Sequence, residues 1–100
     1  MSNVLIFLSE VGSSNYLIPV IKELKEKNLF IKILITKVCV KTFIYNKINF
    51  DCVIDTNFNL VNYINNNKIN KAILSATGSE IEQKILSILR NFNCKTYSFI

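Results

Sequence analysis

Short apolar runs alternate with longer amphipathic stretches along the chain, and this alternation limits the fold more than any other feature of the sequence. Apolar runs of about four to eight residues, bounded by polar residues or glycine, are typical of buried strands. The predicted strands span residues 4–8, 30–36, 52–54, 71–76 and 96–100. Between them, apolar residues recur every three or four positions, as in helices with one buried face. The predicted helices span residues 16–27, 38–46, 60–67 and 79–91.

Strands that alternate with helices at this spacing predict right-handed crossovers and a parallel sheet. We therefore expect an α/β fold, a five-stranded parallel Rossmann-like three-layer sandwich with strand order 3-2-1-4-5. The 100 residues form one domain, since no linker or internal repeat is visible. The chain stops inside an apolar strand, so we expect residues 1–100 to be half of a larger or split protein.

The composition excludes several classes of protein. Half of the residues are apolar, which excludes a disordered chain. The net charge is +5, but the lysines are scattered and Arg90 is the only arginine, so we expect no nucleic-acid partner. No apolar run approaches the roughly 20 residues of a membrane span.

The chain has no histidine, which removes Ser-His and Cys-His nucleophile arrangements. Its three cysteines, Cys39, Cys52 and Cys94, form no CxxC pair, so we expect no metal site and small buried thiols. An odd number of cysteines without disulfide spacing favours a reducing, cytoplasmic location.

The first glycine-containing turn is predicted over residues 9–15, directly after the first strand. Gly12 permits a tight turn, and Ser13, Ser14 and Asn15 offer side-chain donors beside the free N–H groups of the next helix. Two interpretations stay open: a site for an anion, or a strand-to-helix turn with a serine cap. We expect Pro19 to lie near the start of the helix that follows.

The second glycine-containing turn follows the fourth strand and holds Thr77, Gly78 and Ser79. In a 3-2-1-4-5 sheet, both turns fall where the strand order reverses, which is where such sheets bind ligands. Glu80 is a candidate general base or acceptor for a sugar hydroxyl. Alternatively, Glu80 or Glu82 only completes the capping of a helix by Thr77 or Ser79.

Two further groups of residues are candidates for a metal site and for base stacking. Asp51 and Asp55 flank the third strand and form either a metal pair or a solvated strand edge. Most aromatic residues fall at core spacing, and no aromatic stripe suggests base stacking. These are Phe43, Tyr45, Phe58, Tyr63, Phe92, Tyr97 and Phe99.

Two stretches resemble one superfamily. Residues 4–24 resemble the first strand, glycine loop and helix of the GT-B superfamily; they read VLIFLSEVGSSNYLIPVIKEL. Residues 72–80, which read AILSATGSE, are similar to the polar turn at the cleft of that superfamily. That superfamily includes glycosyltransferases and UDP-N-acetylglucosamine 2-epimerases. Ser13 and Ser14 stand where the epimerases carry an arginine and an acidic residue, and many of the transferases carry a histidine that this chain lacks.

The resemblance implies an N-terminal, acceptor-side domain in surface carbohydrate biosynthesis, with a sugar or nucleotide-sugar ligand. In such proteins the nucleotide mainly contacts a second domain, so a second domain or partner chain would complete the site. The isolated chain would then be catalytically silent.

Two other hypotheses stay open. The pattern Ser9-x-x-Gly12-x-Ser14 is also similar to the flavodoxin phosphate loop, which implies FMN as a cofactor. Flavodoxin-like proteins contact the flavin with aromatic residues, and here Phe58 is the only candidate near the third strand. The third hypothesis is a non-enzymatic module that docks a partner protein.

Overall fold

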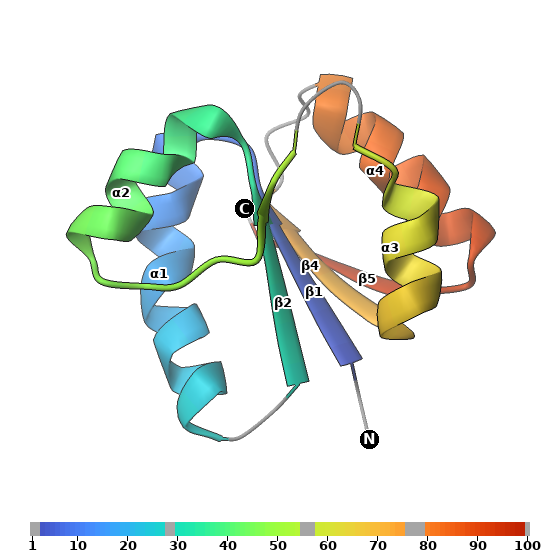
Figure 1. Cartoon of the computed structure of the whole chain (residues 1–100), viewed down its shortest axis with the longest axis horizontal. Helices are drawn as coiled ribbons and strands as arrows, with labels where there is room; N and C mark the ends of the chain where they lie inside the picture. The colour runs from blue at the N-terminus through green and yellow to red at the C-terminus, as the bar shows by residue number, and fades with distance from the viewer. Residues whose placement is uncertain (1–2, 28–29, 55–57, 76–79, 100) are drawn as a thin grey trace.

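A parallel five-stranded sheet with helices on both faces makes up the structure, a computed structural model that describes residues 3–27, 30–54, 58–75 and 80–99 (Figure 1). For residues 11–14, 16, 75, 98 and 99 it describes the backbone alone. The strands are β1 (Asn3–Leu8), β2 (Phe30–Ile35), β3 (Cys52–Val53), β4 (Lys71–Ser75) and β5 (Lys95–Phe99). The helices are α1 (Val11–Glu26), the short 3-10 helix η1 (Lys37–Cys39), α2 (Val40–Tyr45), α3 (Leu60–Asn67) and α4 (Glu80–Asn91).

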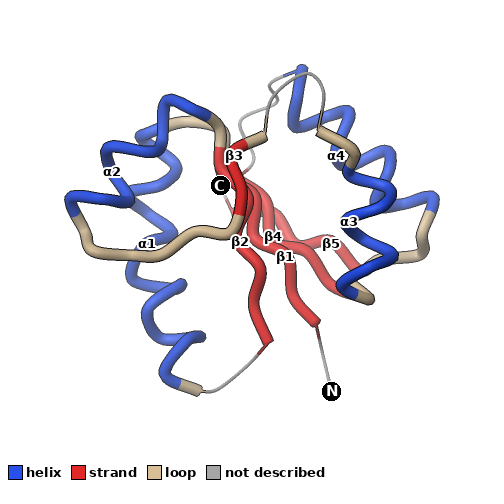
Figure 2. The backbone as a smooth tube through the Cα atoms, viewed as in Figure 1, coloured by secondary structure: helices blue, strands red, loops and turns tan. Residues whose placement is uncertain are grey.

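The strand order β3-β2-β1-β4-β5 confirms the predicted Rossmann-like sandwich. Every strand pair is parallel, and β1 lies in the centre with β2 on one side and β4 on the other. Figure 2 shows the sheet as a middle layer, with α1 and α2 on one face and α3 and α4 on the other. The carboxyl ends of all five strands therefore meet at one edge of the sheet.

Residues of β1 supply both layers of the core because successive side chains of a strand point to opposite faces. Leu5 and Phe7 are fully buried against α3 and α4. Ile6 and Leu8 are as deeply buried, but against α1 and α2. A strand with helices on both of its faces must be apolar throughout, which is why this segment reads as a continuous apolar run.

The first helix begins five residues earlier than predicted. The sequence predicted a loop over residues 9–15, but α1 begins at Val11, so Gly12 and Ser13 stand inside its first turn. Pro19, expected near the helix start, lies two turns into the helix with its side chain exposed. Proline has no N–H to donate to the carbonyl of Asn15, four residues earlier.

The segment after β2 also differs in part from prediction. The predicted helix over residues 38–46 is present as η1 followed by the six residues of α2. Its inward side chains, Cys39 and Phe43, are fully buried, as expected. Tyr45, expected in the core, is 86% exposed. Phe92, expected on the apolar face of the last helix, follows α4 and is 36% exposed.

We predict that Pro19→Ala raises the free energy of unfolding by about 1–2 kcal/mol. Alanine restores a donor for the Asn15 carbonyl, and this gain exceeds the loss of proline's restriction of the unfolded chain. Urea unfolding checks the change, with Lys22→Ala on the exposed side of the same helix as the control. A variant no more stable than wild type would show that α1 already accommodates the proline without cost.

Candidate functional site

β1 and β4, the strands that precede the two turns selected from the sequence, are neighbours in the sheet, so the strand order reverses between them as predicted. Only Ser9 and Glu10 separate β1 from α1, and Glu10 adopts extended backbone at the helix N-terminus. Gly12, Ser13, Ser14 and Asn15 therefore belong to the first turns of α1 and form no phosphate-cradling loop. Asn15 is exposed, and the side chains of Ser13 and Ser14 lie outside the described residues.

Packing explains why this helix extends through residues with low helix propensity. A glycine in a helix costs only about 1 kcal/mol relative to alanine. Leu17, Ile18 and Ile21 are buried in the same core cluster as β1. Burial of side chains of this size is worth about 1.5–3 kcal/mol each, so the helix that carries them forms despite its weak first turn.

Of the second turn, only the end is described. Thr77, Gly78 and Ser79 lie outside the described residues. Glu80 is the first residue of α4 and is exposed, whereas Glu82 is 6% exposed. The spacing Ser79-x-x-Glu82 is that of a capping box, in which a glutamate three residues into the helix reaches back to the cap.

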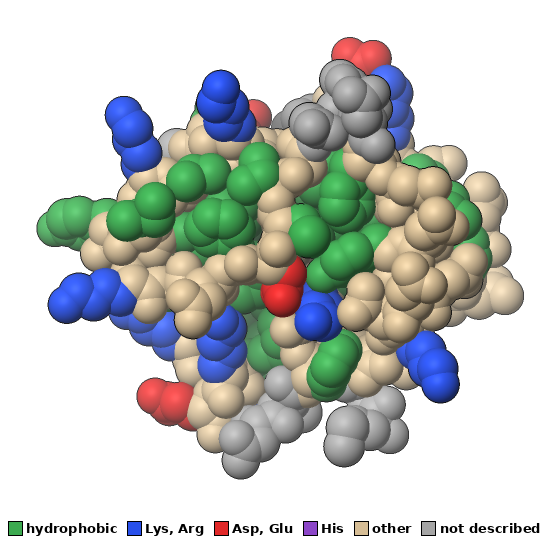
Figure 3. All heavy atoms as spheres, viewed as in Figure 1, with side chains coloured by type: hydrophobic (Ala, Val, Ile, Leu, Met, Phe, Trp, Pro, Cys, Tyr) green, Lys and Arg blue, Asp and Glu red, His purple; other side chains and the backbone are tan. Residues whose placement is uncertain are grey.

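A groove lies beside the reversal point, over the carboxyl ends of β2 and β3. Its volume is about 810 Å³, within the range typical of small-molecule sites. The groove is bounded by the segment after β2, the end of β3 and one side of α4. The lining side chains are Thr36, Lys37, Val38, Ile54, Phe58, Leu60, Glu80, Ile81, Lys84, Ile85 and Ile88. In Figure 3, hydrophobic side chains gather between β3 and helices α3 and α4.

The groove combines an apolar lining with charged side chains. Isoleucine, leucine, valine and phenylalanine make up most of the lining, and Ile85 and Leu60 are also part of the core. Lys37 and Lys84 bring two positive charges to the groove, and Glu80 brings one negative charge. The arrangement suits a ligand with an apolar part and a negatively charged group.

Thr36 fixes the β2 side of the groove to the end of β1. Its Oγ1 donates a hydrogen bond of 2.8 Å to the backbone oxygen of Ser9, and its backbone N donates to the oxygen of Leu8 at 3.1 Å. The Cys39 thiol also donates to the Leu8 oxygen, over 3.7 Å. These contacts hold the segment that carries Lys37 and Val38 against the carboxyl end of the central strand.

Of the residues that line the groove, the sequence indicated Glu80 as a candidate site residue and did not indicate the groove itself. A usable signal was present, since Thr36 and Lys37 directly follow a buried strand, as the residues of the two glycine turns do. Lys84 follows Glu80 by one helical turn and so shares its side of α4. Phe58 was considered only as a flavin contact, and its place in the groove depends on where α3 packs.

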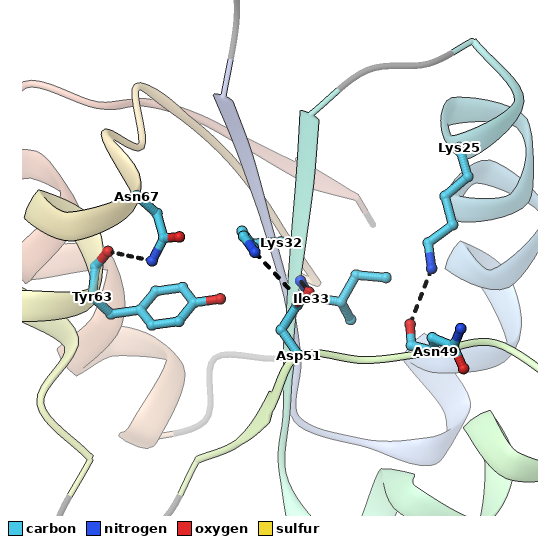
Figure 4. Close-up of polar contacts among 7 residues, drawn as sticks. All are labelled: Lys25, Lys32, Ile33, Asn49, Asp51, Tyr63 and Asn67. Atoms are coloured by element: carbon cyan, nitrogen blue, oxygen red, sulfur yellow. Dashed lines mark hydrogen bonds and ion pairs between the residues drawn. The ribbon is translucent and has the colours of Figure 1, made fainter.

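A polar cluster lies between the sheet and α3, and the ring of its Tyr63 packs against Phe58 of the groove with a centroid distance of 5.5 Å. Asp51 Oδ2 accepts a 2.7 Å hydrogen bond from the backbone N–H of Ile33, and Asp51 Oδ1 lies 3.6 Å from Lys32 Nζ. Figure 4 shows the hydroxyl end of Tyr63 directed toward Lys32 and Asp51. Asp51 thus supplies a hydrogen-bond acceptor to the backbone of β2 at the edge of the sheet. Asp55, its suggested metal partner, lies outside the described residues.

The surroundings of this cluster raise the pKa values of the Tyr63 hydroxyl and the neighbouring Cys52 thiol. Burial, followed by the Asp51 carboxylate and by Cys52, raises the pKa of the Tyr63 hydroxyl. Burial and then Asp51 raise the pKa of the Cys52 thiol, and Lys32 opposes them in part. At neutral pH the thiol is therefore a poor nucleophile and the phenol is a hydrogen-bond donor rather than a base.

The described part of the chain shows neither a metal cluster nor a membrane-spanning helix. No three histidine, cysteine, aspartate or glutamate residues within it lie close enough together to hold a metal ion. None of its helices is long and apolar enough to cross a membrane.

The fold is that of Rossmann-like α/β proteins, and the groove lies at the carboxyl edge of its sheet. No protein-family model, curated protein sequence or solved structure matches the chain.

We predict that Tyr63→Phe makes the protein less sensitive to alkaline pH. A phenol whose pKa is raised by folding contributes stability that is complete below its ordinary pKa of about 10 and is lost as pH rises through the folded value. Between pH 9 and 11, as monitored by urea unfolding, wild type should lose more stability than the variant, by less than about 1 kcal/mol because solvent screens a side chain that is only partly buried.

Tyr45→Phe is the matched control, because Tyr45 is 86% exposed. Its pH dependence should follow that of wild type. An equal loss in all three proteins would show that the Tyr63 hydroxyl ionises as easily in the folded chain as in the unfolded one.

Proposed function

We propose that the chain is the N-terminal, acceptor-side domain of a GT-B-type sugar enzyme, and that its groove receives an acceptor with an apolar part and a phosphate or other anionic group. The observation that carries the proposal is the position of the groove. It opens at the carboxyl edge of a 3-2-1-4-5 parallel sheet, beside the reversal of strand order. Sheets of this kind bind their ligands at that edge.

The chemistry of the groove supports an amphipathic acceptor. Ile81, Ile85 and Ile88 recur along one side of α4 and offer an apolar wall. Lys84 on α4 and Lys37 on the opposite side of the groove would neutralise an anionic group. A free sugar has no apolar surface large enough to match this wall, so we expect the acceptor to carry a hydrocarbon or aromatic portion.

Among the described residues that line the groove, Glu80 is the carboxylate and the best-placed group to receive a proton from an acceptor hydroxyl. A general base must lie within hydrogen-bond reach of the hydroxyl that attacks. The donor sugar would come from a second domain or partner chain, so the chain alone would bind acceptor without turnover. Glu80 would then contribute to rate only in the completed enzyme.

The strand order supports this proposal over an FMN domain. Flavodoxin-like sheets have the order 2-1-3-4-5, in which the first strand is next to the third. Here β1 lies between β2 and β4. The helical backbone of residues 11–14 also departs from the phosphate loop that the Ser9-x-x-Gly12-x-Ser14 pattern suggested.

An amide NMR titration of the chain tests the proposal. We predict that octyl phosphate, kept below its micelle concentration, shifts the amides of residues 36–38 and 80–88, and that inorganic phosphate or octyl glucoside alone shifts them far less. UDP and FMN should leave these amides unchanged. Shifts with UDP alone would replace the acceptor-side proposal with a nucleotide site, and a yellow, FMN-bound protein would revive the flavin hypothesis.

We further predict that Lys84→Gln weakens octyl phosphate binding by a factor of up to about five, since an exposed ion pair is worth about 0.2–1 kcal/mol. Lys95→Gln, on the exposed part of β5, should bind as wild type does. If the two variants bind equally well, the charge on α4 has no role in recognition.

A further inference from the structure

Residues 37–47, from η1 to two residues past α2, carry a surface of which the proposed acceptor site uses only Lys37 and Val38. We call it the η1–α2 face and define it by Val38, Ile44 and Tyr45 together with Lys37, Lys41 and Lys47. Cys39 and Phe43 point inward and are fully buried. At helical spacing, residues 37, 38, 41, 44 and 45 fall on the arc opposite these two, so they share the outward side.

The apolar residues of the η1–α2 face are the most exposed in the described part of the chain. Val38 is 62% exposed, Ile44 65% and Tyr45 86%, whereas the other large exposed apolar side chains are 36–49% exposed. In Figure 3, hydrophobic side chains extend outward over α2, and lysine side chains project around them. Single exposed apolar residues are ordinary, but three within about two turns of helix mark an interaction surface.

The charge of this segment is unbalanced. Residues 37–47 contain three lysines and no acidic residue. On α1, by contrast, Glu23 and Glu26 stand among the lysines, and Glu23 pairs with Lys27 at 3.6 Å. Residues 37–47 therefore place three positive charges beside the exposed apolar side chains and contribute no negative charge of their own.

We propose that the η1–α2 face binds the surface of an anionic lipid bilayer. Tyr45 and Ile44 would enter the headgroup region, where a tyrosine keeps its hydroxyl in water and its ring in the apolar boundary. The three lysines would face the lipid phosphates. Protein interfaces are depleted in lysine and enriched in arginine, so the same surface fits a protein partner less well.

The η1–α2 face adjoins the groove, because Lys37 and Val38 belong to both. A protein held on a bilayer by this face would present the groove close to the lipid surface. The inference does not depend on the proposed function, because it requires only the exposure and charge of residues 37–47.

The test is sedimentation of the full chain with vesicles. We expect binding to vesicles of phosphatidylcholine mixed with phosphatidylglycerol, little binding to phosphatidylcholine alone, and weaker binding as salt rises. Tyr45→Ser combined with Ile44→Ser should weaken binding more than tenfold, because less apolar surface enters the bilayer. Tyr97→Ser, which removes an exposed tyrosine from β5, is the matched control and should bind as wild type does.

The lysines are tested by replacing Lys37, Lys41 and Lys47 with glutamine. Each lysine near a charged surface is worth about 1 kcal/mol, or about fivefold, so the triple variant should bind roughly a hundredfold more weakly. Replacement of Lys22, Lys68 and Lys95 removes the same charge from other exposed positions and should have a much smaller effect.

Three results would overturn the proposal. Equal losses in the two lysine variants would show general charge attraction with no defined face. A folded wild-type chain, verified by circular dichroism, that does not sediment with either vesicle would exclude lipid binding. A concentration-dependent dimer that Tyr45→Ser abolishes would show that a second copy of the chain covers this surface.

Discussion

The structure depends on the burial of β1 on all four sides. Its backbone is hydrogen-bonded to β2 and β4, and its side chains alternate between two separate core clusters. Leu5, Phe7 and Leu8 have no exposed surface. A polar side chain in this strand would lose its water without gaining a partner, at a cost of about 1–3 kcal/mol or more. The helices on both faces are therefore positioned by one strand of six residues.

The β3 edge of the sheet has fewer backbone pairs than the centre around β1. β3 has only two residues, and it pairs with β2 through Leu34 and Ile35. Below it, Asp51 continues the pairing, since its carboxylate accepts from the N–H of Ile33 and its own N–H donates to the Ile33 oxygen at 2.9 Å. The Asp51 carboxylate thus takes the place of a strand backbone acceptor beside β2.

The groove and the η1–α2 face both arise from the way the chain leaves β2. Thr36 anchors this segment to the end of β1, and Cys39 and Phe43 bury its inner side. With the inner side fixed, Lys37 and Val38 must face the groove and the solvent. The two proposals therefore share one structural element but rest on different properties of it, namely the lining of a cavity and the exposure of a helix.

The sequence by itself determined the alternation of elements, the apolar strands and the parallel sheet, because strands buried on both faces need continuous apolar runs. It also led to the correct strand order, and it singled out Glu80. Only the tertiary structure decided that Gly12 and Ser13 are helical, since packing of Leu17, Ile18 and Ile21 outweighs weak local propensity. Only the tertiary structure decided that Tyr45 is exposed and that Phe58 and Lys84 line the same groove. These residues are far apart in sequence, and local periodicity carries no information about which helix packs beside which strand end.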